Sequence, residues 1–265
     1  MQPVIGVFDS GLGGFTVLKE LQRIMPGARY LYYGDSLYAP YGPRTKPWIQ
    51  SRSQRIVEYL LQQGAQLIVV ACNTATASAI HYLRKQFPFP FVGMEPAVKP
   101  AALHTKSGVI GVLATKGTLM GDHYHQTKQQ FAGSVKVLTQ VGFQLVEMIE
   151  RSSSLDVTLP LLHKYLTPML EQGSDYIVLG CTHYPLLKSQ IESIIKGRAI
   201  VVDPAMAVAK QTFRKLSNEQ QNSVVQANEN TTDITIISSK LTPAYQRIAK
   251  DLFPGVPIFR EDPLL

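Results

Sequence analysis

The sequence predicts an α/β protein in which helices cover parallel sheets. Short apolar runs rich in β-branched residues alternate with segments of helical period, as in VIGVFD followed by FTVLKELQRIM and AQLIVVAC followed by ATASAIHYLRKQF. Unbroken apolar runs of this length are typical of strands buried on both faces of a parallel sheet. The chain has 265 residues, which is enough to bury a sizeable core.

The same alternation continues along the chain. GVIGVLAT precedes a helical stretch at 124–131, DYIVLGC precedes LLKSQIESIIKG, and RAIVVDP precedes MAVAKQTFRKL. A polar stretch, QQNSVVQANENTTD, then leads to the strand ITIISS, the helix AYQRIAKDLF and a closing VPIFRED. Each apolar run is expected to be a strand and each periodic segment the helix that follows it.

Two strand–turn–helix patterns recur at nearly the same spacing. Ile5 in VIGVFDSGLGG and Ile110 in VIGVLATKGTL are 105 residues apart, and the only two cysteines, Cys72 and Cys181, are 109 residues apart. The repeat predicts two pseudo-symmetric lobes, each with a mainly parallel sheet, and an active site in the cleft between them. Prolines in EPAVKPA and VDPAMA suggest the limits of the lobes. The first lobe is then 1–97 plus 207–265, and the second is 98–206.

The composition narrows the class of protein. Apolar residues make up 45% of the chain and charged residues 17%, which is typical of a globular protein. No apolar run approaches the roughly 18 residues of a membrane helix, and the start of the chain does not resemble a signal peptide. We therefore expect a cytoplasmic protein with free thiols and no membrane partner. The net charge is +7, but the basic residues are scattered, which argues against a nucleic-acid partner.

Both cysteines occupy matching positions, at the end of an apolar run and just before a helix, in VVACNTAT and VLGCTHYP. Ligands of open parallel sheets bind outside the carboxyl ends of the strands. A helix N-terminus at that point presents backbone N–H groups, which lower the pKa of a thiol. Either cysteine alone could be an apolar filler of the core. The matching positions of both favour a shared chemical role.

Four uses of such a pair can be compared. A disulfide is disfavoured in the cytoplasm. Zinc is disfavoured because only Cys181 and His183 have ligand spacing and no CxxC motif is present. A single nucleophile leaves the other cysteine without a role. Two facing acid–base thiols suit racemisation of an amino acid, because one proton must leave one face of Cα while another arrives on the opposite face. The chain has no phosphate- or dinucleotide-binding motif, so neither a cofactor nor a metal is expected.

Five motifs together resemble the glutamate racemases, of the cofactor-independent aspartate/glutamate racemase family. They are VFDSGLGGFTVL, YYGDSLYAPYG, VVACNTATA, GVLATKGTL and LGCTHYPLL, and the resemblance extends from position 4 to about 205. It implies interconversion of L- and D-glutamate without a cofactor, which supplies D-glutamate for peptidoglycan synthesis in a bacterium. Family members are often dimers. A homodimer is therefore compatible with the resemblance, and the sequence leaves the oligomeric state open.

The resemblance also implies roles for individual residues. Cys72 and Cys181 are the two acid–base residues, the first acting on the D enantiomer and the second on the L enantiomer. Asp9 is expected beside Cys72 and His183 beside Cys181, each assisting proton transfer. The residues expected to bind the substrate are Asp9, Ser10, Tyr41, Gly42, Asn73, Thr74, Thr115, Thr118, Thr182 and His183.

A glutamate that assists catalysis is expected near VGFQLVEMIE, where the chain departs from the family pattern. Glu150 fits the register best and is the predicted catalytic residue, with Glu147 as the alternative.

Several of these residues have a purely structural alternative. Asp9, Asn73 and Thr74 could simply cap the helices that follow them. His183 could be a buried structural histidine, and Tyr41 could pack within its loop.

Three other functions also stay open from the sequence. A related enzyme such as an aspartate racemase would share the fold. A nucleic-acid-binding module would show binding that falls steeply with salt. A thiol redox protein would form one disulfide on mild oxidation.

Overall fold

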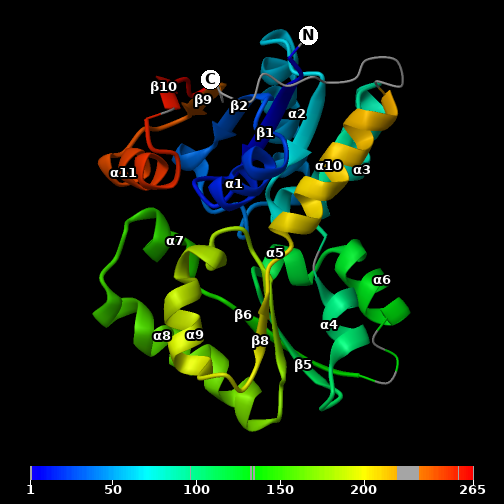
Figure 1. Cartoon of the computed structure of the whole chain (residues 1–265), viewed down its shortest axis with the longest axis vertical. Coiled ribbons are helices and arrows are strands. Elements are labelled where there is room, and N and C mark those ends of the chain that lie inside the picture. The colour runs from blue at the N-terminus through cyan, green and yellow to red at the C-terminus, as the bar shows by residue number, and fades with distance from the viewer. Residues whose placement is uncertain are drawn as a thin grey trace.

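The computed structural model describes residues 2–95, 97–131, 133, 135–219, 233–255 and 257–264. Its strands form two sheets, one in the upper and one in the lower half of Figure 1, with helices around each. Every strand pairing between described residues is parallel. The predicted fold class is therefore confirmed. Most of the polar stretch QQNSVVQANENTTD lies outside the described residues.

The first sheet has the strand order β10-β9-β2-β1-β3-β4. The strands of the C-terminal part of the chain, β9 and β10, belong to this sheet. β9 pairs with β2, and β10 pairs with β9. The limits of the two lobes at 97/98 and 206/207 stay a prediction. The strands are β1 (Val4–Asp9), β2 (Arg29–Gly34), β3 (Leu67–Val70), β4 (Phe91–Gly93), β9 (Asp233–Ser238) and β10 (Pro257–Glu261).

The second sheet has the order β6-β5-β7-β8, which repeats β2-β1-β3-β4 of the first sheet strand for strand. In this correspondence β1 matches β5 and β3 matches β7, so Cys72 and Cys181 each follow the equivalent strand of their own sheet. The strands are β5 (Val109–Ala114), β6 (Lys136–Val141), β7 (Tyr176–Gly180) and β8 (Ile200–Val202).

Alternate side chains of the central strands enter different halves of the core. Val7 and Val69 belong to the buried cluster that includes α1, whereas Phe8 and Ile68 belong to the cluster that includes α2 and α3. This two-sided burial explains why these strands are unbroken apolar runs in the sequence. The helices around the first sheet are α1 (Phe15–Ile24), α2 (Lys46–Gln62), α3 (Asn73–Gln86), α10 (Ala205–Glu219) and α11 (Pro243–Leu252), with the short 3-10 helix η1 (Ser36–Tyr38).

The second sheet is covered in the same way, with α4 and α6 on one side and α8 and α9 on the other (Figure 1). None of the described helices is long and apolar enough to cross a membrane. The helices of this half are α4 (Val98–His104), α5 (Lys116–Leu119), α6 (Asp122–Phe131), α7 (Leu145–Glu150), α8 (Leu155–Glu171) and α9 (Lys188–Ile195), with the 3-10 helix η2 (Tyr184–Leu187).

Candidate active site

The carboxyl ends of the two sheets face each other between the lobes, and the predicted site residues gather there. Asp9, which ends β1, joins the lobes directly. Its Oδ2 accepts a hydrogen bond of 2.9 Å from Thr182 Oγ1, and its Oδ1 accepts one of 2.8 Å from the N–H of Gly11. Burial raises the pKa of Asp9, and the positive charge of His183 partly opposes this shift. A buried carboxyl group therefore takes part in the contact between the lobes.

Cys72 is buried at the turn between β3 and α3. Its Sγ accepts a hydrogen bond of 3.4 Å from the N–H of Ala75 and lies 3.7 Å from Ser10 Oγ. Burial raises the pKa of the thiol, and the negative charges of Asp9 and, more weakly, Cys181 add to this shift. The Ala75 N–H and the Ser10 hydroxyl oppose it. The prediction that a helix N-terminus lowers the pKa is thus wrong for Cys72, because burial outweighs the helix, and this cysteine rests as a thiol.

Cys181 is buried at the end of β7, next to a charged pair. Its Sγ lies 3.9 Å from His183 Nδ1, and His183 Nε2 donates a hydrogen bond of 2.7 Å to Glu150 Oε1. Burial alone lowers the pKa of His183, but Cys181, Glu150 and Asp9 together raise it well above its usual value. The surroundings of His183 therefore favour its imidazolium form. The imidazole of His183 thus lies between the Cys181 sulfur and the Glu150 carboxylate.

The glycine-rich turn after β1 allows these side chains of the second lobe to approach. A Cβ at Gly11 would lie 1.8 Å from Glu150 Oε1, and a Cβ at Gly13 would lie 2.3 Å from His183 Nδ1. The N–H of Leu12, between the two glycines, donates a hydrogen bond of 2.8 Å to Glu150 Oε1. The turn thus receives Glu150 and His183 in a space that only glycine leaves open.

Glu150 rather than Glu147 contacts the histidine. Glu147 lies one turn earlier on α7 and lines a cavity of about 340 Å³ together with Pro40 and Phe143. The geometry favours Glu150 over the alternative, whereas its catalytic role stays a prediction.

A chain of hydroxyl groups crosses from one lobe to the other. Thr74 Oγ1 lies 2.8 Å from Thr115 Oγ1, which lies 2.8 Å from Thr118 Oγ1. Beside Thr74, Asn73 is buried, and neither its Nδ2 nor its Oδ1 has a hydrogen-bond partner among the described residues. Buried amide atoms are normally paired. Asn73 is thus a group whose partner is expected to be a ligand, although it also occupies the first turn of α3.

Tyr41 and Gly42 contribute differently. The Tyr41 hydroxyl donates a hydrogen bond of 2.5 Å to Asp35 Oδ2 and is buried in the first lobe. Gly42 faces the second lobe, since a Cβ there would lie 3.7 Å from Thr115 Cβ. The loop therefore brings Gly42 to the cleft. The phenol of Tyr41 points into the first lobe, where its hydrogen bond to Asp35 holds the loop in place.

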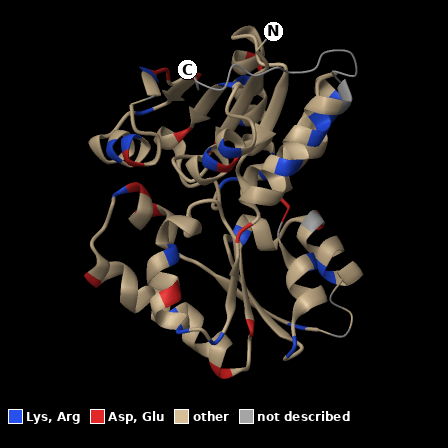
Figure 2. Cartoon of the chain, viewed as in Figure 1, with Lys and Arg blue, Asp and Glu red and all other residues tan. Residues whose placement is uncertain are grey.

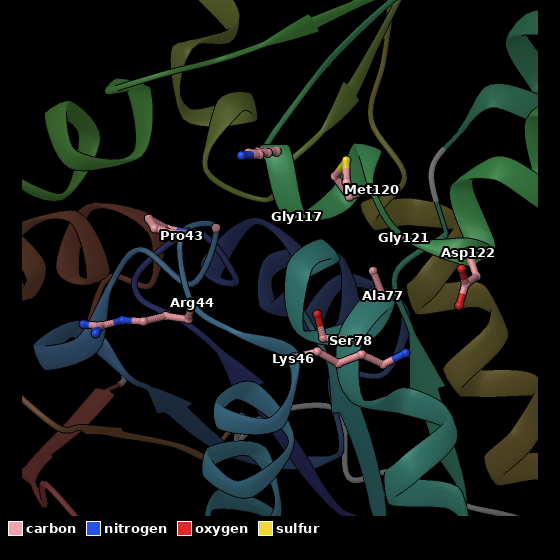
Figure 3. A pocket seen from close by; sticks show the side chains of 11 residues that line it. Pro43, Arg44, Lys46, Ala77, Ser78, Gly117, Met120, Gly121 and Asp122 are labelled. Atoms are coloured by element: carbon pink, nitrogen blue, oxygen red, sulfur yellow. The ribbon is translucent and has the colours of Figure 1, made fainter.

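A cavity of about 360 Å³ is lined by residues that include Ala77 and Ser78 on α3 and Gly117 on α5 (Figure 3). Both lobes line it, and its charged residues include Arg44 and Lys46 from the first lobe and Lys116 from the second. Elsewhere the basic residues are spread over both lobes (Figure 2). Among the described residues, no group of three or more histidine, cysteine, aspartate or glutamate side chains is arranged to hold a metal ion.

Sequence reasoning missed two parts of this site. The N–H of Leu12 has no signal of its own in the sequence, but the close spacing of Gly11 and Gly13 in SGLGG could have indicated a close approach. The buried pair of Asp35 and Arg52 behind Tyr41 gave no recognisable pattern.

The two sheets share a four-strand order, and each presents a cysteine at the equivalent strand end, an arrangement that fits an isomerase of the amino-acid racemase class. Residues 15–212 match the family model for Asp/Glu/Hydantoin racemases, and the chain belongs to this family. A glutamate racemase from Ectopseudomonas mendocina is 46% identical over 221 residues, which cover 83% of this chain and 84% of the relative. One from Roseiflexus sp. is 49% identical over 210 residues, which cover 78% of this chain and 77% of the relative.

Solved structures agree with this assignment. Glutamate racemase RacE1 from Bacillus anthracis superposes with a TM-score of 0.84 at 29% identity, covering 98% of this chain and 97% of that one. Escherichia coli glutamate racemase, solved with L-glutamate and the activator UDP-MurNAc-ala, gives a TM-score of 0.83 at 30% identity, covering 98% and 99%. The resemblance to glutamate racemases read from the motifs is confirmed.

Proposed function

We propose that this enzyme interconverts L- and D-glutamate with two cysteines, one on each face of the α-carbon. The observation that carries the proposal is the equivalent placement of Cys72 and Cys181, each buried at a strand end of its own lobe. The Asp9–Thr182 hydrogen bond links the two lobes at these strand ends. The relatives support glutamate as the substrate. The Escherichia coli enzyme was solved with L-glutamate and the Francisella tularensis enzyme with D-glutamate.

The unequal surroundings of the two thiols suggest how the reaction begins. With L-glutamate bound, Cys181 acts as a thiolate beside the His183 imidazolium and takes the α-proton. The Cys72 thiol, whose pKa is raised by burial, then delivers its own proton to the opposite face. The Cα–H bond breaks towards one sulfur and a new Cα–H bond forms from the other. The protein ends with a thiol at Cys181 and a thiolate at Cys72, which is the state required for the reverse reaction.

Polar groups around the cleft account for binding of an amino acid with two carboxylates. The amide of Asn73, which has no hydrogen-bond partner among the described residues, and the hydroxyls of Ser10 and Thr74 lie on the first-lobe side of the contact between the lobes. The hydroxyl of Thr182 lies on the other side. Short hydroxyls, amides and backbone N–H groups at strand ends hold carboxylates without a metal. Thr115, Thr118 and Gly42 are proposed to complete the site from the opposite wall.

The experiment that tests this function is incubation of the pure protein with L-glutamate in D2O, without pyridoxal phosphate. We expect loss of optical rotation and incorporation of deuterium at Cα. Replacement of either thiol, in Cys72→Ala or Cys181→Ala, is expected to abolish both signals. Ser193→Ala, on an exposed face of α9, serves as the control. Racemisation that survives in either cysteine variant contradicts the two-base mechanism, and no racemisation by the wild-type protein contradicts the function.

Substrate choice and cellular role belong to the same proposal. L-aspartate in the same assay decides between a glutamate and an aspartate racemase, and we expect the higher kcat/KM for glutamate. We further propose that the enzyme is cytoplasmic and supplies D-glutamate for peptidoglycan. Expression in a bacterium that requires added D-glutamate is expected to remove that requirement. A homodimer is the expected assembly, and sedimentation of the purified protein tests it.

A further inference from the structure

Behind the cleft, one buried arginine ties together two parts of the chain that are far apart in sequence. Arg52 on α2 is 5% exposed. Its Nε and Nη2 donate hydrogen bonds of 2.9 and 2.7 Å to the two carboxylate oxygens of Asp35. Its Nη1 and Nη2 also donate hydrogen bonds of 2.7 Å to the backbone carbonyls of Leu264 and Pro263. The guanidinium lies over the Tyr38 ring at 4.5 Å. One flat cation thus serves a carboxylate and two carbonyls at once, a pattern that arginine can form and lysine cannot.

The 262–264 segment is held in place by further hydrogen bonds. The Tyr33 hydroxyl donates one of 2.6 Å to the carbonyl of Asp262, and the N–H of Asp262 donates one of 2.9 Å to the carbonyl of Ser238. The N–H of Leu264 donates one of 3.0 Å to Asp262 Oδ1. The segment therefore presents its carbonyls to Arg52 in a fixed geometry.

The hydrogen bonds of Arg52 also extend to the loop that carries Tyr41 and Gly42. Asp35 Oδ2, which accepts from Arg52 Nε, also accepts the hydrogen bond of the Tyr41 hydroxyl. Tyr41 precedes Gly42, the residue of this loop that faces Thr115 across the cleft. The Asp35 carboxylate therefore connects Arg52 with Tyr41, the residue next to Gly42.

We infer that the 262–264 segment positions the substrate loop at 39–43, with Arg52 as the positioning residue. The segment and Arg52 touch no reacting atom. Their effect is to hold Gly42 at the distance from the second lobe at which the cleft fits the substrate. The inference rests on the proposed function only for its kinetic readout, because the movement of the loop can be measured without turnover.

The decisive variant is Asp262→Ala, which removes the acceptor for the Leu264 N–H and leaves the Arg52–Asp35 pair intact. We expect KM for glutamate to rise three- to tenfold while kcat stays within twofold. Backbone hydrogen exchange in a peptide covering 36–45 is expected to become faster, although the substitution lies outside that peptide. Asp251→Ala, the same change of charge at an exposed position of α11, is the matched control and should alter neither value.

Arg52→Lys provides the second test and should show the same split with a larger rise in KM. Because it leaves Asp35 with a poorer buried partner, its urea unfolding is measured alongside. If Arg52→Lys does not fold, Asp262→Ala alone decides. The inference is overturned if Asp262→Ala leaves both KM and the hydrogen exchange of the 36–45 peptide unchanged in a protein whose wild type racemises glutamate. If the wild-type protein does not turn over glutamate, the proposed function fails and the exchange result alone judges the 262–264 segment.

Discussion

Substitution of Gly13 by alanine tests how tightly the two lobes must fit. An added Cβ at Gly13 would lie 2.3 Å from His183 Nδ1 and 2.7 Å from two carbons of the ring. An ordinary contact begins at 3.4 Å, so the imidazole must retreat by about 1 Å. His183 Nε2 now lies 2.7 Å from Glu150 Oε1, and a retreat of that size breaks or lengthens this hydrogen bond.

The expected loss of activity follows from that displacement. A reacting group misplaced by about 1 Å loses roughly 100-fold in rate, which corresponds to about 2.7 kcal/mol in the activation free energy. The free energy of unfolding should fall by about 1–3 kcal/mol, as for other overpacked sites. We therefore expect Gly13→Ala to fold and to racemise glutamate about 100 times more slowly than the wild-type protein.

The assay measures kcat/KM polarimetrically from L- and from D-glutamate. The two enantiomers have equal free energy, so the two values must be equal in every variant, which provides an internal check. Gly133→Ala is the control, because a Cβ there would meet nothing within 4 Å. A Gly13→Ala protein with kcat/KM within threefold of the wild type would refute the argument that the turn sets the position of His183.

Three further predictions follow from the charged groups. The pKa of His183 is raised well above its usual value, so its protonation stabilises the fold fully below about pH 6.5, and this stabilisation is lost as the pH rises through the folded pKa. In urea unfolding, the advantage of the wild type over His183→Gln should shrink as the pH rises above about 6.5, and a constant difference would contradict it. Glu150→Gln should lower kcat at least tenfold and Glu147→Gln much less, since only the first contacts His183; equal losses would reopen the choice between them. Lys46→Gln should lower kcat/KM two- to fivefold at low salt and little at about 0.5 M salt, because Lys46 is one of three basic residues that line the cavity of about 360 Å³ with Asp122, and salt screens exposed charges. A loss that persists at high salt would exclude electrostatic steering of the substrate.

The sequence allowed the fold class and the matching cysteines to be predicted because both depend on local pattern. VIGVFD and VIGVLA are buried on both faces, so their strands carry an unbroken apolar signal. The strand β6 was missed because it lies at the edge of the second sheet and its residues are only partly buried. Helix α8 was missed because Pro160 and Pro168 lie within it and suggest a break.

The candidate site was predictable as a set of residues but not as a geometry. The motifs contain Asp9, Cys72 and His183, yet only the folded chain shows that burial outweighs the helix N-terminus at Cys72. Tyr41 holds its loop through Asp35. Asp35 in turn pairs with Arg52, seventeen residues further along the chain, and this ion pair forms only when the chain folds. Such long-range pairs leave no periodic trace in a single sequence.

The most direct test of two facing thiols is the isotope content of both enantiomers early in the reaction of L-glutamate in D2O. If Cys181 removes the proton and Cys72 delivers a different one, the D-glutamate first formed carries deuterium at Cα while the remaining L-glutamate keeps protium. D-glutamate that retains the original protium would show that a single group carries the same proton from one face to the other, and would contradict the account.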